Sequence, residues 1–572
     1  MSDLKGQLTL RGVVVGCVGC VVITASSVYT ALRMGALPWP IIFAAIVSLF
    51  FLRAVSRGRS TLNEANVTHT VMSSGAMVAG GLAFTIPGAW MLGLADEISA
   101  LDLAVIAVGG VVLGLVGSVL LRRHFIEEEG LEYPIGQAAA QTLKAGDAGG
   151  ATGRRLFGAM GAAGLYALLR DGLGVIPSML AALPVPGVAF GIYNSPLSLA
   201  VGFLVGTGAV LVWFAGALIA NFGIIVGAPA LGLCDVATAQ AVVSSLGMGL
   251  MMGCGVAVIA RDILPRGLAG ARRAWAARRD AAGVVGLTAA SAASARPAPG
   301  HARRRSAGVA ALAVAAVALA AATVLGLPPA VAAAVVLLAF VAAAMAAQSV
   351  GQTGIDPLEI FGLIVMLLIA AFADVAPARL FFIAALVAVA AGLAGDVMND
   401  FKAGHVLGTS PRAQWVGQAI GGVVGALVAV AALEALLAGY GPDAFGPGRD
   451  FVAAQASVVA TMVGGIPHVP AFAVGLAAGF ALYLAGFPAM MLGLGVYLPF
   501  YLSFTGFLGA MAKVAWGRVG AWRRRGMAPE ERAAAEAADE ERGLIVASGL
   551  MGGESIMGIV LAMIVAGGAL LS

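Results

Sequence analysis

Two copies of one polar signature carry much of the ionisable chemistry in an otherwise apolar chain. Each copy is an Asn, an acid directly after it and a His five residues beyond the acid: Asn63, Glu64 and His69, then Asn399, Asp400 and His405. Both copies adjoin apolar stretches, where ionisable groups are costly and usually mark a transport path. The spacing therefore favours proton transfer by these acids and His residues, with chance recurrence of a loose pattern as the alternative.

A further acid, Glu554, lies in the Gly-rich segment 549–558, directly before a last apolar run. An isolated carboxylate at such a place must be paired, protonated or exposed to water. Glu554 and Glu64 are our first candidates for proton carriers, followed by Asp400 and the two His residues of the signature. The alternative for Glu554 is a purely structural role as a hydrogen-bonding partner.

Several polar side chains have the chemistry to hold a substrate. Lys402 could attract a substrate carboxylate, or could instead extend toward phospholipid headgroups. Asn63, Tyr133 and Gln137 could hydrogen-bond peptide-like groups. His468, in a Pro-His-Val-Pro stretch, fits either a substrate site or a turn.

The segment 131–144 is too short and too polar to cross a bilayer, and it contains Pro134 and Gly136. These features predict a re-entrant or broken helix that lines a cavity.

Motifs for common enzyme chemistry are missing from the sequence. No Lys follows a Gly as in a P-loop, no His is followed by Glu, and no Ser has the glycines of G-x-S-x-G. Cys17 and Cys20 lie beside glycines in an apolar stretch, where we expect helix packing rather than metal or redox chemistry. We expect no cofactor and no enzyme activity. Secondary transport is the leading hypothesis, a channel or passive pore is the alternative, and an intramembrane enzyme is a weaker one.

Composition places the chain in the membrane. It has 572 residues, of which 60% are hydrophobic and 11% charged, and its mean hydropathy is +0.98. A span needs about 20 apolar residues, so the apolar runs predict an all-α polytopic protein with roughly 14–17 transmembrane helices, some of them broken or re-entrant. Continuous hydrophobicity, without in-out alternation, excludes a membrane barrel.

Basic residues predict topology and domain boundaries rather than nucleic-acid binding. Lys5 and Arg11 precede the first apolar run, which has no processing site for a signal peptidase, so we expect a cytoplasmic N-terminus and a retained anchor. Segment 261–305 holds ten Arg against two Asp and predicts a cytoplasmic linker between a half at 1–260 and a related half at 306–572.

The same count places both signature copies on the cytoplasmic side, which favours a repeat of parallel orientation. It also places a second basic loop there, 513–542, which ends in an expected short surface helix over 529–542.

Six segments of the chain, in order, match the pattern of one known family. The segments are Leu62 to Ala76 with Phe84 to Pro87, Leu131 to Leu143, Asn194 to Gly206, Asp396 to Pro411, Met491 to Pro499 and Ala547 to Met557. Together they resemble the oligopeptide transporter family that includes the yellow stripe-like metal-chelate carriers. Gln141 stands where that family commonly has an acid, which puts a charged role there in doubt. The acidic Ser-Pro-Tyr and Lys-Ile-Pro-Pro-Arg motifs of the family's eukaryotic peptide branch are missing, so the chain is closer to the prokaryotic or yellow stripe-like branch.

This resemblance implies uptake of small peptides, or of metal bound to peptide-like chelators, coupled to proton entry. We expect alternating access around a cavity formed by the polar third helix, segment 131–144 and the region of Asp400. No compact cluster of His, Cys and acids fits a bare ion, so a metal would travel as a chelate. The implied location is the bacterial inner membrane, with protons, substrate and the lipid bilayer as partners and a homodimer through Gly-rich faces.

Overall fold

The computed structural model describes residues 6–35, 37, 41–145, 151–258, 260–261, 314–317, 319–320, 323–353 and 356–571. The segment 261–305, which we predict to be a basic linker, lies outside the described residues except for Arg261.

Helices make up nearly all of the described chain. The α-helices are α1 (Leu10–Met34), α2 (Ile41–Ser56), α3 (Leu62–Ala83), α4 (Pro87–Met91), α5 (Ala100–Arg122), α6 (Pro134–Ala145), α7 (Ala151–Ala167), α8 (Pro196–Val205), α9 (Thr207–Leu218), α10 (Gly227–Ala230), α11 (Val236–Val258), α14 (Pro329–Thr353), α15 (Leu358–Phe372), α16 (Pro377–Leu407), α17 (Pro411–Tyr440), α18 (Ala454–Gly464), α19 (Val469–Leu484), α20 (Ala489–Tyr497), α21 (Phe500–Arg523) and α22 (Pro529–Leu571). Short 3-10 or π segments are η1 (Ala95–Glu97), η2 (Arg123–Glu128), η4 (Leu168–Gly172), η5 (Ile219–Val226) and η8 (Pro442–Ala444), and the strands are β1 (Met179–Val185) and β2 (Val188–Tyr193).

Among the described residues, nine helices are long and apolar enough to cross a membrane, and five more are apolar but only 10–17 residues long. Apolar runs become helices in hydrocarbon because each backbone N–H and C=O must be bonded within its own segment. The predicted all-α polytopic class is confirmed. The segment that contains Pro134 forms the 12-residue helix α6, which is too short to cross.

Two helices, α3 and α16, form the centre of the bundle. The apolar windows of their spans are 100% and 94% buried, against 39–61% for the other seven long helices. Helix α3 packs against α1, α2, α16 and α17. Polar groups on α3 and α16 are therefore shielded from lipid by protein on every side.

Glycines let helix backbones touch at several crossings. A Cβ on Gly425 of α17 would overlap the Cα of Gly75 in α3, and one on Gly421 would overlap the backbone oxygen of Val71. The thiol of Cys20 in α1 donates to the Gly421 carbonyl at 3.3 Å. Gly421 and Gly425, four residues apart, therefore let α17 approach α3 closely, and Cys20 belongs to the same interface.

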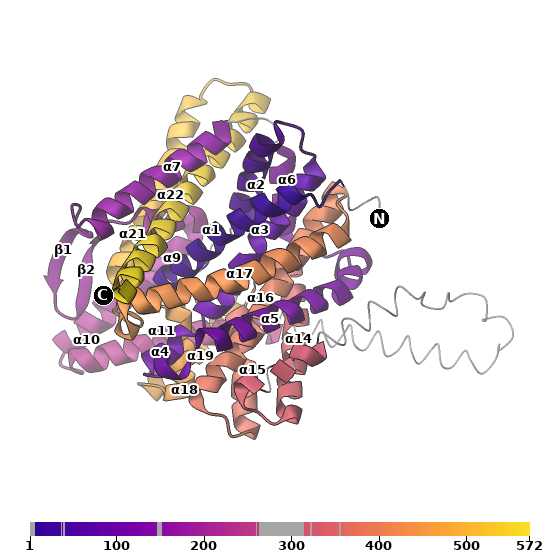
Figure 1. The fold of residues 1–572 in the computed structure, drawn as a ribbon. Coiled ribbons are helices and arrows are strands. Elements are labelled where there is room, and N and C mark those ends of the chain that lie inside the picture. The colour runs from indigo at the N-terminus through magenta and orange to yellow at the C-terminus, as the bar shows by residue number, and fades with distance from the viewer. Residues whose placement is uncertain are drawn as a thin grey trace, which may run out of the picture.

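The bundle has two distinct ends. Helix α1 begins beside Glu64 of the first signature copy, with Arg11 bonded to that acid, and ends with Arg33 in a cleft that also contains residues of the β1–β2 hairpin. We call the first the motif end and the second the hairpin end. Figure 1 shows the β1–β2 hairpin at the left edge of the bundle.

The β1–β2 hairpin is a local departure from the all-α class that the apolar runs predict. Val185 pairs with Val188 across Pro186 and Gly187, whose φ is 75°. Proline followed by a residue with positive φ is the pattern of a type II turn. The hairpin is fastened to α21, because the backbone N–H of Tyr193 donates to Thr505 Oγ1 at 3.0 Å and that hydroxyl donates to the Tyr193 carbonyl at 3.1 Å.

Helices α8 and α21 also meet backbone to backbone. A Cβ on Gly202 of α8 would overlap the carbonyl oxygen of Gly506 in α21. The hairpin, α8 and α21 therefore form one tightly connected set.

The last helix, α22, runs for 43 residues without interruption. The prediction of a separate short surface helix over 529–542 is wrong in one respect, because the helix continues past Arg542 into the final span. A single Gly543 costs a helix only about 1 kcal/mol, which is too little to end it. Its first turns pack on α21 through an Arg524–Asp539 ion pair.

Candidate functional site

The two signature copies meet at the crossing of α3 and α16. His69 Nδ1 lies 3.5 Å from Asp400 Oδ1, and both side chains are buried. The other carboxylate oxygen, Oδ2, accepts hydrogen bonds from Gln418 Nε2 at 2.5 Å and from Ser73 Oγ at 3.3 Å. The sequence pattern indicates His69 and Asp400 as separate candidates for proton carriers, and the structure places them together as one pair.

The copies do not occupy equivalent positions in the fold. The first lies in the opening turns of α3 and the second in the last turns of α16. The helices run antiparallel, because His69 lies beside Asp400 near one end and a Cβ on Gly81 would contact Val389 near the other. Both copies are at the same end, as expected, but they are not related as members of a parallel repeat.

Two further acids extend the buried polar region along α16. Asp396 lies one turn before Asp400 and is 1% exposed, and a Cβ on Gly395 would be only 2.5 Å from Asp356 Oδ2. In the described part of the chain, Asp396 Oδ2 and both carboxylate oxygens of Asp356 have no hydrogen-bond partner. Sequence reasoning missed both acids, although the i, i+4 spacing of Asp396 and Asp400 was a signal.

Glu64 is engaged at the motif end. Its carboxylate accepts two hydrogen bonds from Arg11, at 2.7 and 2.8 Å, and one from Thr9 Oγ1 at 2.5 Å. Asn63 Oδ1 accepts from Thr409 Oγ1 at 2.9 Å. These contacts join α1, α3 and the loop after α16.

The segment before α6 is fastened to α14 and α16. Tyr133 has a φ of 46° and donates its hydroxyl to the Ala347 carbonyl at 3.0 Å. Lys402 Nζ donates to the Leu131 carbonyl at 2.6 Å, and Asn399 Oδ1 accepts from the backbone N–H of Gly136 at 3.1 Å. The predicted substrate residues Tyr133 and Lys402 are thus both bonded within the protein.

The other candidates lie at the edges of this region or away from it. Gln137 is exposed and donates to the Glu132 carbonyl at 2.7 Å. His405 is exposed near the end of α16. His468 caps α19, where its Nδ1 accepts a hydrogen bond from the backbone N–H of Ala471 at 3.2 Å. It takes no part in the contacts described above around Glu64 and Asp400.

Glu554 lies at the hairpin end, buried in α22 with 2% exposure. Its carboxylate pairs with Arg170 Nη2 at 2.8 Å. It also accepts from Ser195 Oγ at 2.9 and 3.1 Å and from the backbone N–H of Leu197 at 2.7 Å. The negative charge therefore lies at the N-terminus of α8, where the helix dipole favours an anion.

Arg170 is the centre of this network, and sequence reasoning missed it. Its guanidinium holds Asp171 through two bonds, at 2.7 and 2.6 Å, in addition to Glu554. It also donates a hydrogen bond from Nη1 to the backbone carbonyl of Asn194 at 2.5 Å. An Arg-Asp pair between two apolar runs was the available signal, since such charges need partners inside the bundle.

A cleft of about 600 Å³ opens beside this network at the hairpin end. Its polar lining comprises Arg33, Asp171, Ser178, Asp450 and three tyrosines, Tyr193, Tyr440 and Tyr501, and the hairpin provides apolar side chains. Among these lining residues, only Asp171 is hydrogen-bonded to Arg170, which is the partner of Glu554. The guanidinium of Arg170 also lies 5.4 Å from the ring centre of Tyr193. The volume is within the range typical of small-ligand sites.

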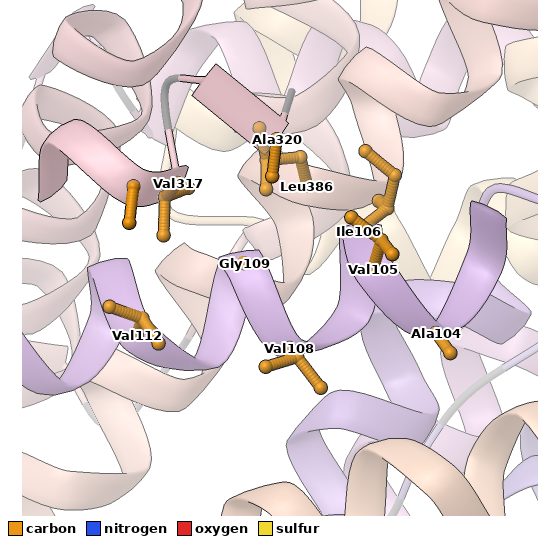
Figure 2. A pocket seen from close by; sticks show the side chains of 10 residues that line it. Ala104, Val105, Ile106, Val108, Gly109, Val112, Val317, Ala320 and Leu386 are labelled. Atoms are coloured by element: carbon orange, nitrogen blue, oxygen red, sulfur yellow. The ribbon is translucent and has the colours of Figure 1, made fainter. Parts of the chain in front are cut away.

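A second cavity, of about 450 Å³, has a different character. Figure 2 shows it between α5 and Leu386 of α16, with Val317 and Ala320 on the remaining side. Its labelled side chains carry no polar atoms, so it offers nothing to orient a peptide or a charged chelate. Within the described residues there is also no group of three His, Cys, Asp or Glu side chains placed to hold a metal ion.

Comparison with known proteins agrees with this architecture. The model of the family described as "OPT oligopeptide transporter protein" matches residues 7–281 and 302–565. A Haemophilus influenzae protein named "Putative oligopeptide transporter" is 33% identical over 150 residues, a stretch that covers 26% of this chain and 23% of that relative. The family match extends over most of the chain, and the chain therefore belongs to the OPT oligopeptide transporter family.

Proposed function

We propose that this chain is a proton-coupled symporter that imports small peptides or peptide-like metal chelates across the bacterial inner membrane by alternating access. The observation that carries the proposal is the His69–Asp400 pair, buried at the crossing of the two most enclosed helices. Ionisable pairs at such a depth are costly and are typical of proton relays. Membership of an oligopeptide transporter family supports the class of substrate.

Proton binding at this pair would change the charge between α3 and α16. Gln418 and Ser73 both donate to Asp400 Oδ2, and the carboxyl accepts fewer hydrogen bonds once it is protonated. A proton can shift a conformational equilibrium only if it binds the two states differently. The proposal therefore requires that the surroundings of the His69–Asp400 pair differ between the two states of the alternating-access cycle.

Glu64 and Glu554 stay in the proposal under one condition. Each has an arginine partner, Arg11 and Arg170 respectively, so a proton that arrives there must release the arginine. His405 is exposed at the motif end and would act as an entry or exit point for protons.

The proposed orientation has the motif end in the cytoplasm. Basic side chains gather there: Arg122 lies over the ring of Phe401 near the end of α16, and Arg11 bonds Glu64. The positive-inside rule supports this placement. Asn63, Tyr133, Gln137 and Lys402 would then contact substrate on its release side, once their present bonds open, whereas His468 would act from α19.

Uptake into proteoliposomes tests the proposal. Labelled tri-alanine and a ferric complex of a peptide-like chelator would be offered with and without an inward proton gradient. We expect saturable, gradient-driven uptake of at least one of them by the wild type. Asp400→Asn and His69→Gln should lower the gradient-driven component about tenfold or more, while exchange of labelled for unlabelled substrate without a gradient persists.

His124→Gln is the matched control, because His124 is exposed on η2. Flux that neither saturates nor responds to the gradient would favour a channel. Intact coupling in both variants would remove the pair from the proton path.

A further inference from the structure

We propose that the cleft at the hairpin end is the outward-facing substrate site, and that it binds a short zwitterionic peptide by both termini. Arg33 takes the carboxylate and Asp450 takes the ammonium group. This inference rests on the proposed function, because it assumes that peptides are carried. It goes further by naming the site, its two charged contacts and the chemical form of the ligand.

Arg33 is poised for an anion. Its guanidinium lies 5.5 Å from the ring centre of Tyr29 and 4.9 Å from that of Phe451. Among the residues that the structure describes, no carboxylate pairs with it, and its buried Nε has no hydrogen-bond partner. A guanidinium presents paired donors that match a carboxylate, so an incoming C-terminus would supply the direct partner that no described carboxylate provides.

The acidic side of the cleft is divided between two aspartates. Asp171 is held by two bonds from Arg170. Asp450 is exposed at the rim of the cleft and makes no ion pair within the described part of the chain. Asp450 is therefore the carboxylate available to an ammonium group.

The tyrosines suit the part of a peptide between its termini. No hydrogen bond to another described residue engages the hydroxyl of Tyr193, Tyr440 or Tyr501, and all three side chains line the cleft. A tyrosine hydroxyl can donate to a peptide carbonyl or accept from a peptide N–H. The hairpin side chains Leu183 and Phe190 add apolar surface for substrate side chains of varied shape.

The site is also connected to the interior. Asp171 lies in the cleft and shares Arg170 with Glu554. Because Asp171 lines the same cleft as Arg33 and Asp450, the charges of a bound peptide act on the carboxylate that shares Arg170 with Glu554. Occupation of the cleft is thereby linked to the buried acid of α22.

Calorimetric titration of the protein in lipid nanodiscs tests the site without requiring transport. The probes are tri-alanine, tri-alanine amide, which lacks the carboxylate, and N-acetyl-tri-alanine, which lacks the ammonium group. Wild type should bind tri-alanine most tightly. Arg33→Gln should weaken tri-alanine about tenfold or more and leave the amide unchanged. Asp450→Asn should weaken tri-alanine similarly and leave the N-acetyl peptide unchanged.

Arg449→Gln is the matched control, because Arg449 is exposed beside Asp450 and does not line the cleft. Arg33→Lys keeps the charge if Arg33→Gln fails to fold, and Asp450→Asn changes only an exposed loop. If wild type binds the three peptides alike, or if the charge variants keep wild-type selectivity, the cleft assignment is overturned while peptide transport stands. If wild type neither binds nor takes up any peptide, the cleft assignment fails together with the peptide alternative of the proposed function, and if the ferric chelate is not taken up either, the proposed function itself fails.

Discussion

Glu64 and Glu554 are both buried glutamates paired with an arginine, yet the two pairs differ in their access to water. The Arg11 side chain is 37% exposed, whereas the Arg170 side chain is 0% exposed. Arg11 can turn into solvent if Glu64 is neutralised. Arg170 cannot, so the loss of Glu554 leaves a buried charge with only Asp171 to balance it.

Glu554→Gln should therefore lower the apparent melting temperature in detergent, at a cost on the order of 3 kcal/mol, because one partner of a buried ion pair is removed. Glu64→Gln is the control and should cost about 1 kcal/mol or less, since its partner is partly exposed. Adding Arg170→Gln to Glu554→Gln should recover part of the loss. A fully stable Glu554→Gln variant that has lost only proton coupling would instead support Glu554 as a proton carrier.

At this scale the sequence predicts which groups are unusual but not what they contact. His69, Asp400 and Glu554 stand out because they are ionisable within apolar runs. Their partners come from segments far away in the chain, as with Arg170 and Glu554, which are 384 residues apart. Only the packing of α22 against α7 and α8 brings that pair together.

Helix packing in this protein depends on positions where a side chain would not fit. Gly425 is the clearest case, since its Cα faces Gly75 across the contact of α17 and α3. In lipid such contacts are stabilised by close van der Waals packing rather than by the hydrophobic effect.

Gly425→Ala should destabilise the protein by about 1–3 kcal/mol, because the added methyl group forces two backbones apart. Gly158→Ala provides the comparison, since Gly158 lies in α7 with open space around its Cα, and alanine there should be neutral or stabilising by up to about 1 kcal/mol. Thermal unfolding of both variants measures the difference. Equal stability would show that the α3–α17 contact can relax at no cost.

Helices and strands could be predicted from the sequence only where the local sequence determines them. Apolar runs predict helices because lipid leaves the backbone few alternatives. The β1–β2 hairpin escaped notice because its residues are as apolar as those of a span, although Pro186 and Gly187 were a local signal for a turn. The continuity of α22 past Gly543 was also missed, although a single glycine costs a helix only about 1 kcal/mol and need not end it.

The whole molecule has a basic motif end and a cleft-bearing hairpin end. The proposed orientation makes the first cytoplasmic and the second external. Composition predicted the membrane class and the Arg pattern predicted this orientation, but neither located the cleft, whose charged residues come from α1, η4 and the loop after α17.

Cysteine labelling tests the orientation. In a background without the four native cysteines, Leu183→Cys in the hairpin and Glu531→Cys in α22 each introduce one exposed thiol. A membrane-impermeant maleimide should label Leu183→Cys in right-side-out vesicles and Glu531→Cys only in inverted ones. The cysteine-free parent reports background labelling, and modification of both thiols from one side would contradict the two-ended arrangement.

The backbone contacts at the glycines restrict how the molecule can move. Where Gly425 faces Gly75, no side chain lies between α3 and α17 that could change rotamer and let one slide past the other, so these two helices move as a single platform. Helix α1 is attached to this platform through the hydrogen bond from Cys20 to the Gly421 carbonyl. The same holds for α8 and α21 at Gly202 and Gly506, with the hairpin attached. Arg33 and Tyr440 belong to the first platform, and Tyr193 and Tyr501 to the second. A peptide held between them would thus sit at the seam between two rigid bodies, where a small rotation of one against the other closes the cleft without reshaping either wall.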